Sequence, residues 1–184
     1  MKLLKIAWLL AMASSVLFAS CKKDKTQEEE QLPPITQTGA NTFGCLINGK
    51  IFVPQGFEQN KPNFSLVVDP TFQNGNFGIV TYNKKQEIRF DFGSNDIKNT
   101  GSFRLEDFTK FVGASIYLDK TNCYFGPSTQ CIFQGPCFVK GNLVITRYDL
   151  SNRIFSGTFD FKLYDPLTSC DTFYITQGRF DKKL

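Results

Sequence analysis

Short segments in which apolar and polar residues alternate recur along the chain after residue 41. The clearest covers residues 155–164, where apolar or small residues from Phe155 to Leu163 are separated by polar ones. Side chains of a β-strand point alternately to its two faces, so this pattern predicts strands with one face in a core. We expect strands at residues 42–47, 50–53, 64–68, 77–82, 87–92, 102–105, 114–119, 143–148, 155–164 and 172–180.

Turn-forming residues separate these segments. Asn48-Gly49 lies between two apolar runs and predicts a type I′ hairpin, because both central residues of that turn need a positive φ. The only helical element that we expect is one short turn at residues 106–111. About ten short strands with turns at this spacing predict a single all-β domain. It is either an antiparallel β-sandwich or a flattened barrel, and the pattern leaves both open.

The first twenty residues have the three parts of a signal peptide. Lys2 and Lys5 form a basic start, residues 6–18 are mainly apolar, and the small residues Ala19 and Ser20 follow. A membrane-spanning helix needs roughly 20 apolar residues, so this run is too short to span comfortably. We therefore expect residues 1–20 to be a signal peptide that is removed after export.

The run Leu17-Phe18-Ala19-Ser20-Cys21 resembles the bacterial lipobox, with Phe18 where Leu is commoner. The resemblance implies cleavage before Cys21 and attachment of two or three fatty acyl chains to it. One acyl chain binds a membrane only marginally, whereas two or three hold durably. The alternative is ordinary cleavage that leaves an unmodified cysteine at the N-terminus.

Residues 21–40 are expected to be the lipidated cysteine and a disordered tether. The segment is rich in charged residues, has few apolar ones and contains Pro33-Pro34. Charged residues after a lipidated cysteine resemble the surface-export signals of Bacteroidota lipoproteins. Those signals favour acidic residues, whereas three lysines surround Asp24 here. Residues 41–184 then form the all-β domain in the cell envelope, anchored to the outer membrane, and its exposure at the cell surface is a hypothesis.

Composition excludes several kinds of chemistry. The chain has no His, and without residues 1–20 it has no Met or Trp either. Ser-His-Asp and Cys-His catalysis and His-ligated metals are therefore excluded, and we expect no cofactor and no metal site. Without Lys2 and Lys5 the 21 basic residues become 19, against 17 acidic ones. This near balance, without a basic cluster, indicates no nucleic-acid partner.

Five cysteines remain besides Cys21. An exported domain meets an oxidising environment, so disulfides are the default expectation. Two bridges among five thiols can form in 15 ways, and we expect Cys45–Cys170 and Cys123–Cys137, which leaves Cys131 unpaired. The spacing of Cys123, Cys131 and Cys137 lacks the CxxC pairs of structural zinc sites.

The segment from Thr38 to Lys50 and the segments Ile154–Phe159 and Gly178–Asp181 resemble uncharacterised lipoproteins of Bacteroidota. The resemblance covers the whole mature domain, but its motifs are structural. It implies an exported all-β lipoprotein and no particular activity.

Three functions fit these features. The first is a binding or interaction module that takes a glycan or another envelope protein, with tyrosines able to stack on sugars: Tyr82, Tyr124, Tyr148 and Tyr164. The second is a calycin-like barrel around a small apolar ligand, for which the many Phe residues would suit the lining.

The third is a glycosidase that uses two carboxylates and needs no histidine. The mid-chain acids are Glu87, Asp91, Glu106 and Asp107. Glu87 and Asp91 alternate with Arg89 on the solvent face of one expected strand, which is typical of surface ion pairs. After residue 20, SxxK, GKS/GKT and DxDxDG motifs are absent. We therefore expect no enzyme, and the binding module is the preferred interpretation.

Overall fold

The computed structural model describes residues 31–56, 61–104, 111–118, 121–123, 138–164 and 172–184. This part contains eleven strands and one short 3-10 helix. The elements are β1 Thr42–Ile47, β2 Lys50–Phe52, β3 Phe64–Asp69, η1 Phe72–Asn74, β4 Asn76–Asn83, β5 Ile88–Asn95, β6 Gly101–Arg104, β7 Phe111–Leu118, β8 Thr121–Cys123, β9 Phe138–Asp149, β10 Ile154–Tyr164 and β11 Phe173–Lys183.

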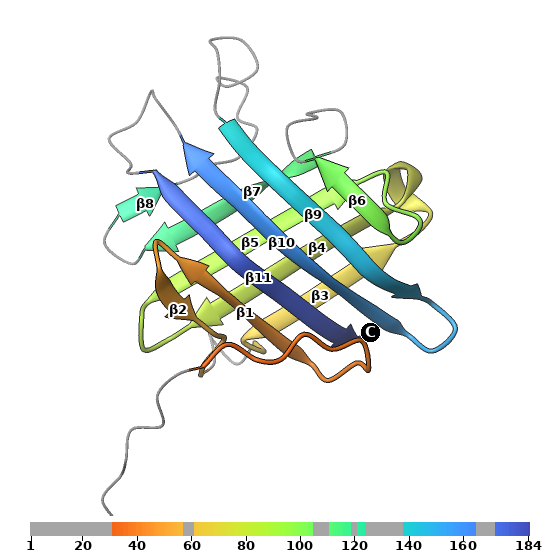
Figure 1. The fold of residues 1–184 in the computed structure, drawn as a ribbon, viewed down its shortest axis with the longest axis horizontal. Coiled ribbons are helices and arrows are strands. Elements are labelled where there is room, and N and C mark those ends of the chain that lie inside the picture. The colour runs from red at the N-terminus through yellow and green to blue at the C-terminus, as the bar shows by residue number, and fades with distance from the viewer. Residues whose placement is uncertain (1–30, 57–60, 105–110, 119–120, 124–137, 165–171) are drawn as a thin grey trace, which may run out of the picture.

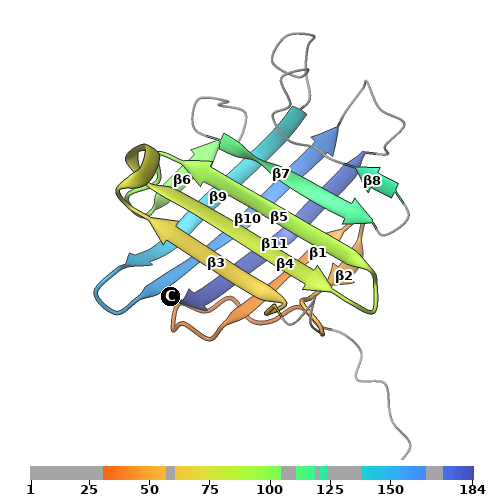
Figure 2. The ribbon, with the colours of Figure 1, turned by 180° about the vertical axis from the view of Figure 1, so that it is seen from behind.

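The strands form two antiparallel sheets that lie face to face, with the strands of one crossing those of the other (Figures 1 and 2). One sheet has six strands in the order β2-β1-β11-β10-β9-β6, and the other has five in the order β3-β4-β5-β7-β8. The sheets do not close into a barrel. The expected all-β fold is therefore confirmed, and of the two open alternatives the structure is the β-sandwich.

All ten expected strands are present, with ends shifted by a few residues. Asn48 and Gly49 have φ values of 50° and 79°, and Ile47 is paired with Lys50, so the expected tight hairpin between β1 and β2 is confirmed. The short strand β8 was not predicted from the sequence. The expected helical turn at 106–111 falls almost entirely outside the described residues, and Phe111 belongs to β7.

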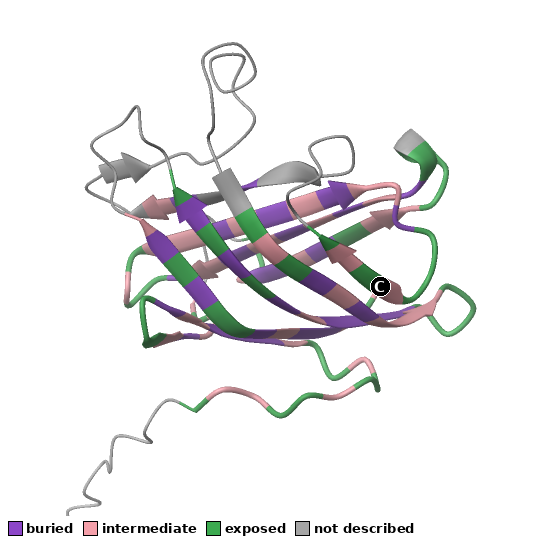
Figure 3. Cartoon of the chain, turned by 45° about the horizontal axis from the view of Figure 1, so that its top comes forward, coloured by how far each residue is buried: buried purple, intermediate pink, exposed green. Residues whose placement is uncertain are grey.

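Phenylalanine fills the space between the sheets. Eleven phenylalanines are buried in the described part of the chain, namely Phe43, Phe52, Phe64, Phe77, Phe90, Phe92, Phe155, Phe159, Phe161, Phe173 and Phe180. They come from both sheets, and buried and exposed residues alternate along the strands (Figure 3). Burying one such ring contributes about 1.5–3 kcal/mol relative to leaving it exposed. Because packed rings occupy the interior, the calycin-like barrel with an enclosed ligand gains no support.

A bulge on β11 brings the interior side chains of β10 and β11 into line. Phe161 is paired with Ile175 and Phe159 with Gly178, so Thr176 and Gln177 together face the single residue Asp160. Gln177 has a φ of 53°, which lets the strand take in the extra residue. Interior positions are therefore three residues apart here, although they are two apart elsewhere on the strand.

The glycine after this bulge makes room for a core ring. A Cβ atom at Gly178 would lie 2.3 Å from the ring of Phe159, so no larger residue fits without moving that ring. We predict that Gly178→Ala lowers the free energy of unfolding by about 1–3 kcal/mol, the usual cost of overpacking a core. Urea denaturation of the purified protein measures the difference.

Gly78→Ala is the matched control, because a Cβ at this position on β4 would meet nothing within 4 Å. The variant should be neutral or slightly more stable than the wild type. In a Phe159→Leu background, Gly178→Ala should cost less than it does alone, since the clashing ring is gone. An equal cost in both backgrounds would contradict this explanation.

Candidate functional site

Among the described residues, the outer face of the six-stranded sheet has a covered end and an end that no described segment crosses, which we call the bare end. Residues 32–40 cross the end of the sheet where β11 finishes, and we call this segment the strap (Figure 1). The other end, where β10 finishes and β11 begins, presents exposed polar and aromatic side chains to solvent. The strap belongs to the segment that we expected to be a disordered tether. That expectation does not hold for residues 32–40, because they bind to the sheet.

Asp181 on β11 holds the strap in place. Its carboxylate accepts hydrogen bonds from the Thr36 hydroxyl at 2.7 Å and from the backbone N–H groups of Thr38, Gly39 and Ala40 at 2.9, 2.8 and 3.0 Å. The Ser156 hydroxyl on β10 donates a further hydrogen bond at 2.6 Å. Consecutive backbone N–H groups that converge in this way form a site suited to an anion. Here the anion is a side chain of the same chain.

The lowered pKa of the Asp181 carboxyl is consistent with these hydrogen bonds. Asp181 is only 1% exposed, and burial by itself would raise the pKa of its carboxyl. The hydrogen bonds from Ser156, Ala40, Thr36 and Thr38 outweigh burial and hold the pKa well below its usual range. Asp181 therefore stays ionised at neutral pH, and its charge is balanced by donors instead of by a cation.

Two arginines form hydrogen bonds with the rest of the strap, and a glycine leaves room for it. The Arg147 guanidinium on β9 donates to the Gln37 carbonyl oxygen at 2.6 Å and to the Asp149 carboxylate at 2.7 Å. Arg179 donates to the Pro33 carbonyl oxygen at 3.2 Å. Gly44 lies directly beneath Pro33, since a Cβ at Gly44 would be 2.6 Å from the Pro33 ring. The strap thus lies across β1, β11, β10 and β9.

We predict that Asp181→Asn lowers the free energy of unfolding by about 2–3 kcal/mol. The amide would offer one acceptor where the carboxylate has two, and its NH2 group would face N–H donors, which leaves buried donors unsatisfied. The exposed residue Asp160 on the neighbouring strand provides the matched control Asp160→Asn, which should leave the urea midpoint nearly unchanged. Equal midpoints for Asp181→Asn and wild type would refute the role of this carboxylate.

The sign of the pH dependence follows from the lowered pKa. In the unfolded chain Asp181 binds a proton near pH 4, whereas in the folded protein it does so only at lower pH. Its stabilising contribution is therefore fully present above about pH 4 and is lost as the pH falls further. The difference in stability between wild type and Asp181→Asn should be constant from pH 7 to 5 and should shrink toward pH 2.

The bare end carries what we call the lysine–tyrosine patch, which consists of Lys140, Lys162, Tyr164 and Tyr174. The Lys162 ammonium lies 5.7 Å from the ring centre of Tyr164 and 5.4 Å from that of Tyr174. Tyr164 is 38% exposed and Tyr174 is 52% exposed. Lys140 on β9 is exposed and directly opposite Lys162 in the register. Cation and aromatic rings thus share one open surface.

Only one of the tyrosines that we considered for sugar stacking belongs to this patch. Tyr164 does, whereas Tyr82 is half-buried, Tyr148 packs edge-on against Phe155, and Tyr124 lies outside the described residues. Burial raises the pKa of the Tyr148 phenol, and the nearby charge of Asp69 adds to the shift. Tyr174 was missed, although it alternates with the buried Phe173 and Ile175 and so points outward by the same period-2 rule.

Two of the four mid-chain acids considered for a carboxylate glycosidase, Glu87 and Asp91, lie in the described part of the chain. Asp91 forms an ion pair with Arg89 at 2.9 Å, as expected for a strand surface. Glu87 is exposed in the turn before β5, with a φ of 55°. Glu106 and Asp107 lie outside the described residues.

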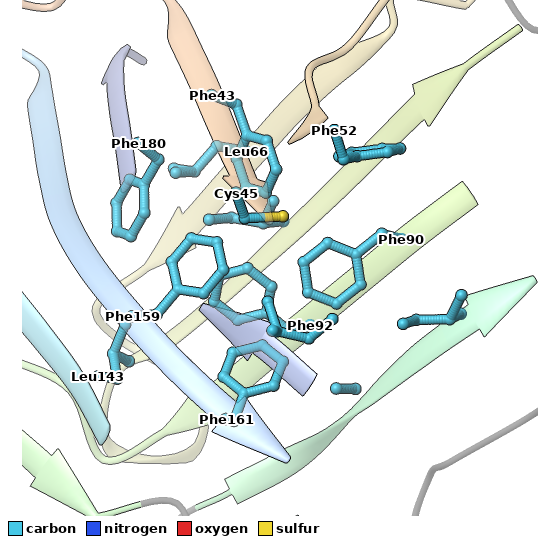
Figure 4. Packing of buried hydrophobic residues seen from close by; sticks show 14 of the residues in the cluster. Phe43, Cys45, Phe52, Leu66, Phe90, Phe92, Leu143, Phe159, Phe161 and Phe180 are labelled. Atoms are coloured by element: carbon cyan, nitrogen blue, oxygen red, sulfur yellow. The ribbon is translucent and has the colours of Figure 1, made fainter. Parts of the chain in front are cut away.

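The expected disulfide between Cys45 and Cys170 is wrong. Cys45 is a free thiol with no exposed surface, and Figure 4 shows it among Phe43, Phe52 and Phe90. It alternates with Phe43 and Ile47 on β1, so its side chain points into the core. Burial raises the pKa of the Cys45 thiol well above its usual range, which keeps it protonated and unreactive.

Removing Cys45 from the possible pairs leaves four cysteines, an even number: Cys123, Cys131, Cys137 and Cys170. Cys131, Cys137 and Cys170 lie outside the described residues, so the Cys123–Cys137 pair stays a prediction. We now predict that Cys45, and not Cys131, is the odd thiol.

Alkylation of the exported protein without reductant tests this assignment. Cys45 should be unlabelled in the native state and should be the one labelled cysteine after denaturation, because only unfolding exposes it. Peptide mapping identifies the labelled site. A disulfide-linked peptide that contains Cys45, or rapid labelling of Cys45 in the native state, would contradict its burial.

Among the residues that the structure describes, no three His, Cys, Asp or Glu side chains are grouped so as to hold a metal ion. No helix in the described part is long and apolar enough to cross a membrane. Comparison of the chain with protein-family models, curated proteins and solved structures gave no match. The interpretation of this face therefore depends on its own geometry and on the sequence.

Proposed function

We propose that the chain is a lipid-anchored protein of the bacterial cell envelope whose β-sandwich serves as a binding module. The observation that carries the proposal is the order of residues 2–21: a basic start, a short apolar run, two small residues and Cys21. This order is typical of an exported lipoprotein precursor. Two or three acyl chains on Cys21 would anchor the mature protein durably.

The strap limits how far the domain can stand from the membrane. Because residues 32–40 lie against the sheet, only residues 22–31 connect Cys21 to the folded part. Ten residues span at most about 35 Å when fully extended. The sandwich would therefore be held near the bilayer, with its orientation restrained by the strap's attachment to the sheet.

A binding role is supported by the contrast between the two ends of the outer face. At the covered end, Asp181 and the strap satisfy each other, so little there is available to a partner. At the bare end, two tyrosines and two lysines are exposed on a rigid sheet. Exposed aromatic residues on a rigid scaffold are suited to recognition.

Metabolic labelling with an alkynyl fatty acid tests the anchor. We predict that the wild type becomes labelled and partitions into the detergent phase, whereas Cys21→Ala is unlabelled and partitions into the aqueous phase. Cys45→Ala is the matched control, since it removes a cysteine from the core and should keep the label. A wild-type protein without label in its bacterial host would refute the proposal.

Protease treatment of intact cells decides between the two faces of the outer membrane. If the domain is exported to the surface, added protease degrades it in intact cells. If it faces the periplasm, degradation requires prior disruption of the outer membrane. Degradation in neither case, with the protein recovered from the cytoplasm, would contradict export.

A further inference from the structure

Two lysines face each other on the outer surface of the six-stranded sheet. Lys140 on β9 and Lys162 on β10 are direct cross-strand partners, and both are exposed. Neither of them forms an ion pair within the described part of the chain. Like charges directly opposite each other on a sheet are destabilising. A bound anion between the two ammonium groups would remove this cost.

The outer face of the other sheet treats its cation differently. Arg89 on β5 also lies over a tyrosine ring, 5.8 Å from the centre of Tyr117, but it is paired with the Asp91 carboxylate at 2.9 Å. That cation is neutralised within the protein. On the lysine–tyrosine patch the nearest acid along β10 is Asp160, one row away on the same face, and among the described residues it forms no ion pair with Lys140 or Lys162. Within the described residues, the positive charge of the two lysines is therefore not paired with an acid.

The position of the patch, on interior strands of the sheet, favours a sugar over a peptide strand as its ligand. β9, β10 and β11 are interior strands of the sheet, so their backbone groups are already paired and cannot accept an added strand. What the surface offers is two exposed tyrosine rings beside the Lys162 ammonium, with Lys140 exposed opposite Lys162 on the neighbouring strand. The apolar face of a pyranose ring packs on an aromatic ring, and the sugar's acidic group would lie between the lysines.

We propose that the lysine–tyrosine patch binds an anionic polysaccharide, with Tyr164 and Tyr174 stacking on sugar rings and Lys140 and Lys162 binding its carboxylate or sulfate groups. The proposal rests on the binding role proposed above and names the chemistry of the ligand. The ligand would lie on the part of the outer face that the strap leaves uncovered.

Affinity electrophoresis of the full-length lipidated protein, in non-ionic detergent, tests the proposal. The probes are polygalacturonate for carboxylated sugars, dextran sulfate for sulfated sugars and dextran as the neutral polymer. We expect retardation by at least one polyanion, no retardation by dextran, and weaker binding as NaCl is raised, because salt screens the lysines. Binding to neither polyanion, or equal binding to dextran, would overturn the proposal.

Variants locate the site. Lys162→Gln and Tyr174→Ala should each raise the dissociation constant about fivefold or more. The first variant removes a cation that binds the acidic group, and the second removes a ring that stacks on the sugar. Lys84→Gln changes an exposed lysine in the turn between β4 and β5 and should bind like the wild type. If Lys162→Gln and Lys84→Gln lose affinity equally, binding follows net charge and the patch is not the site. Circular dichroism verifies that each variant is folded.

This test is separate from that of the anchor. A labelled lipoprotein that binds neither polyanion would refute the ligand and leave the anchor standing. A protein without lipid that binds a polyanion through Tyr174 and Lys162 would refute the anchor and leave the ligand standing. Binding to anionic lipid vesicles that depends on Lys162 but not on Tyr174 would assign the patch to the membrane surface, which also overturns the polysaccharide.

Discussion

Phe90 and Phe92 on β5 meet Phe159 and Phe161 on β10, with ring centroids 4.7–6.2 Å apart. These four rings come from different sheets, so their contact is what holds the sandwich closed. Phe90, Phe92 and Phe159 also contact buried phenylalanines outside this group. Packed aromatic pairs contribute about 0.5–1.5 kcal/mol beyond the area that they bury. The outer surfaces keep their shape because this interior is filled. The bulge and Gly178 on β11 belong to the same constraint, since they let Phe159 lie flat over the strand beside it.

The strap attaches the N-terminal side of the domain to this packed sandwich. Asp181 follows Phe180, whose ring is part of the core, so the carboxylate is fixed on the opposite face of the same strand. The backbone N–H groups of residues 38–40 converge on it, and the chain then enters β1, which is itself paired with β11. The beginning and the end of the folded chain are thus joined twice, by a strand ladder and by a buried carboxylate. The lysine–tyrosine patch lies on the same strands, beyond the reach of the strap.

Alternation of apolar and polar residues predicted the strands, because period-2 burial is a local property of each segment. The same alternation places Cys45 on the inner face of its strand with Phe43 and Ile47. The expected pairing of Cys45 with Cys170 did not take this into account. The bulge at Gln177 was not predictable, since it depends on the register between β10 and β11. Asp181 was missed for the same reason. A lone acid near the chain end gives no sign that donors 141 to 145 residues away converge on it.

The mass of the N-terminal peptide of the mature protein, isolated from its bacterial host, tests the central claim most directly. The account predicts a peptide that begins at Cys21 and carries a diacylglyceryl group, with or without a third acyl chain on its amino group. The basic start and the apolar run before Cys21 should be absent from the mature protein. A peptide that retains residues 1–20, or one that begins at an unmodified Cys21, would contradict the account.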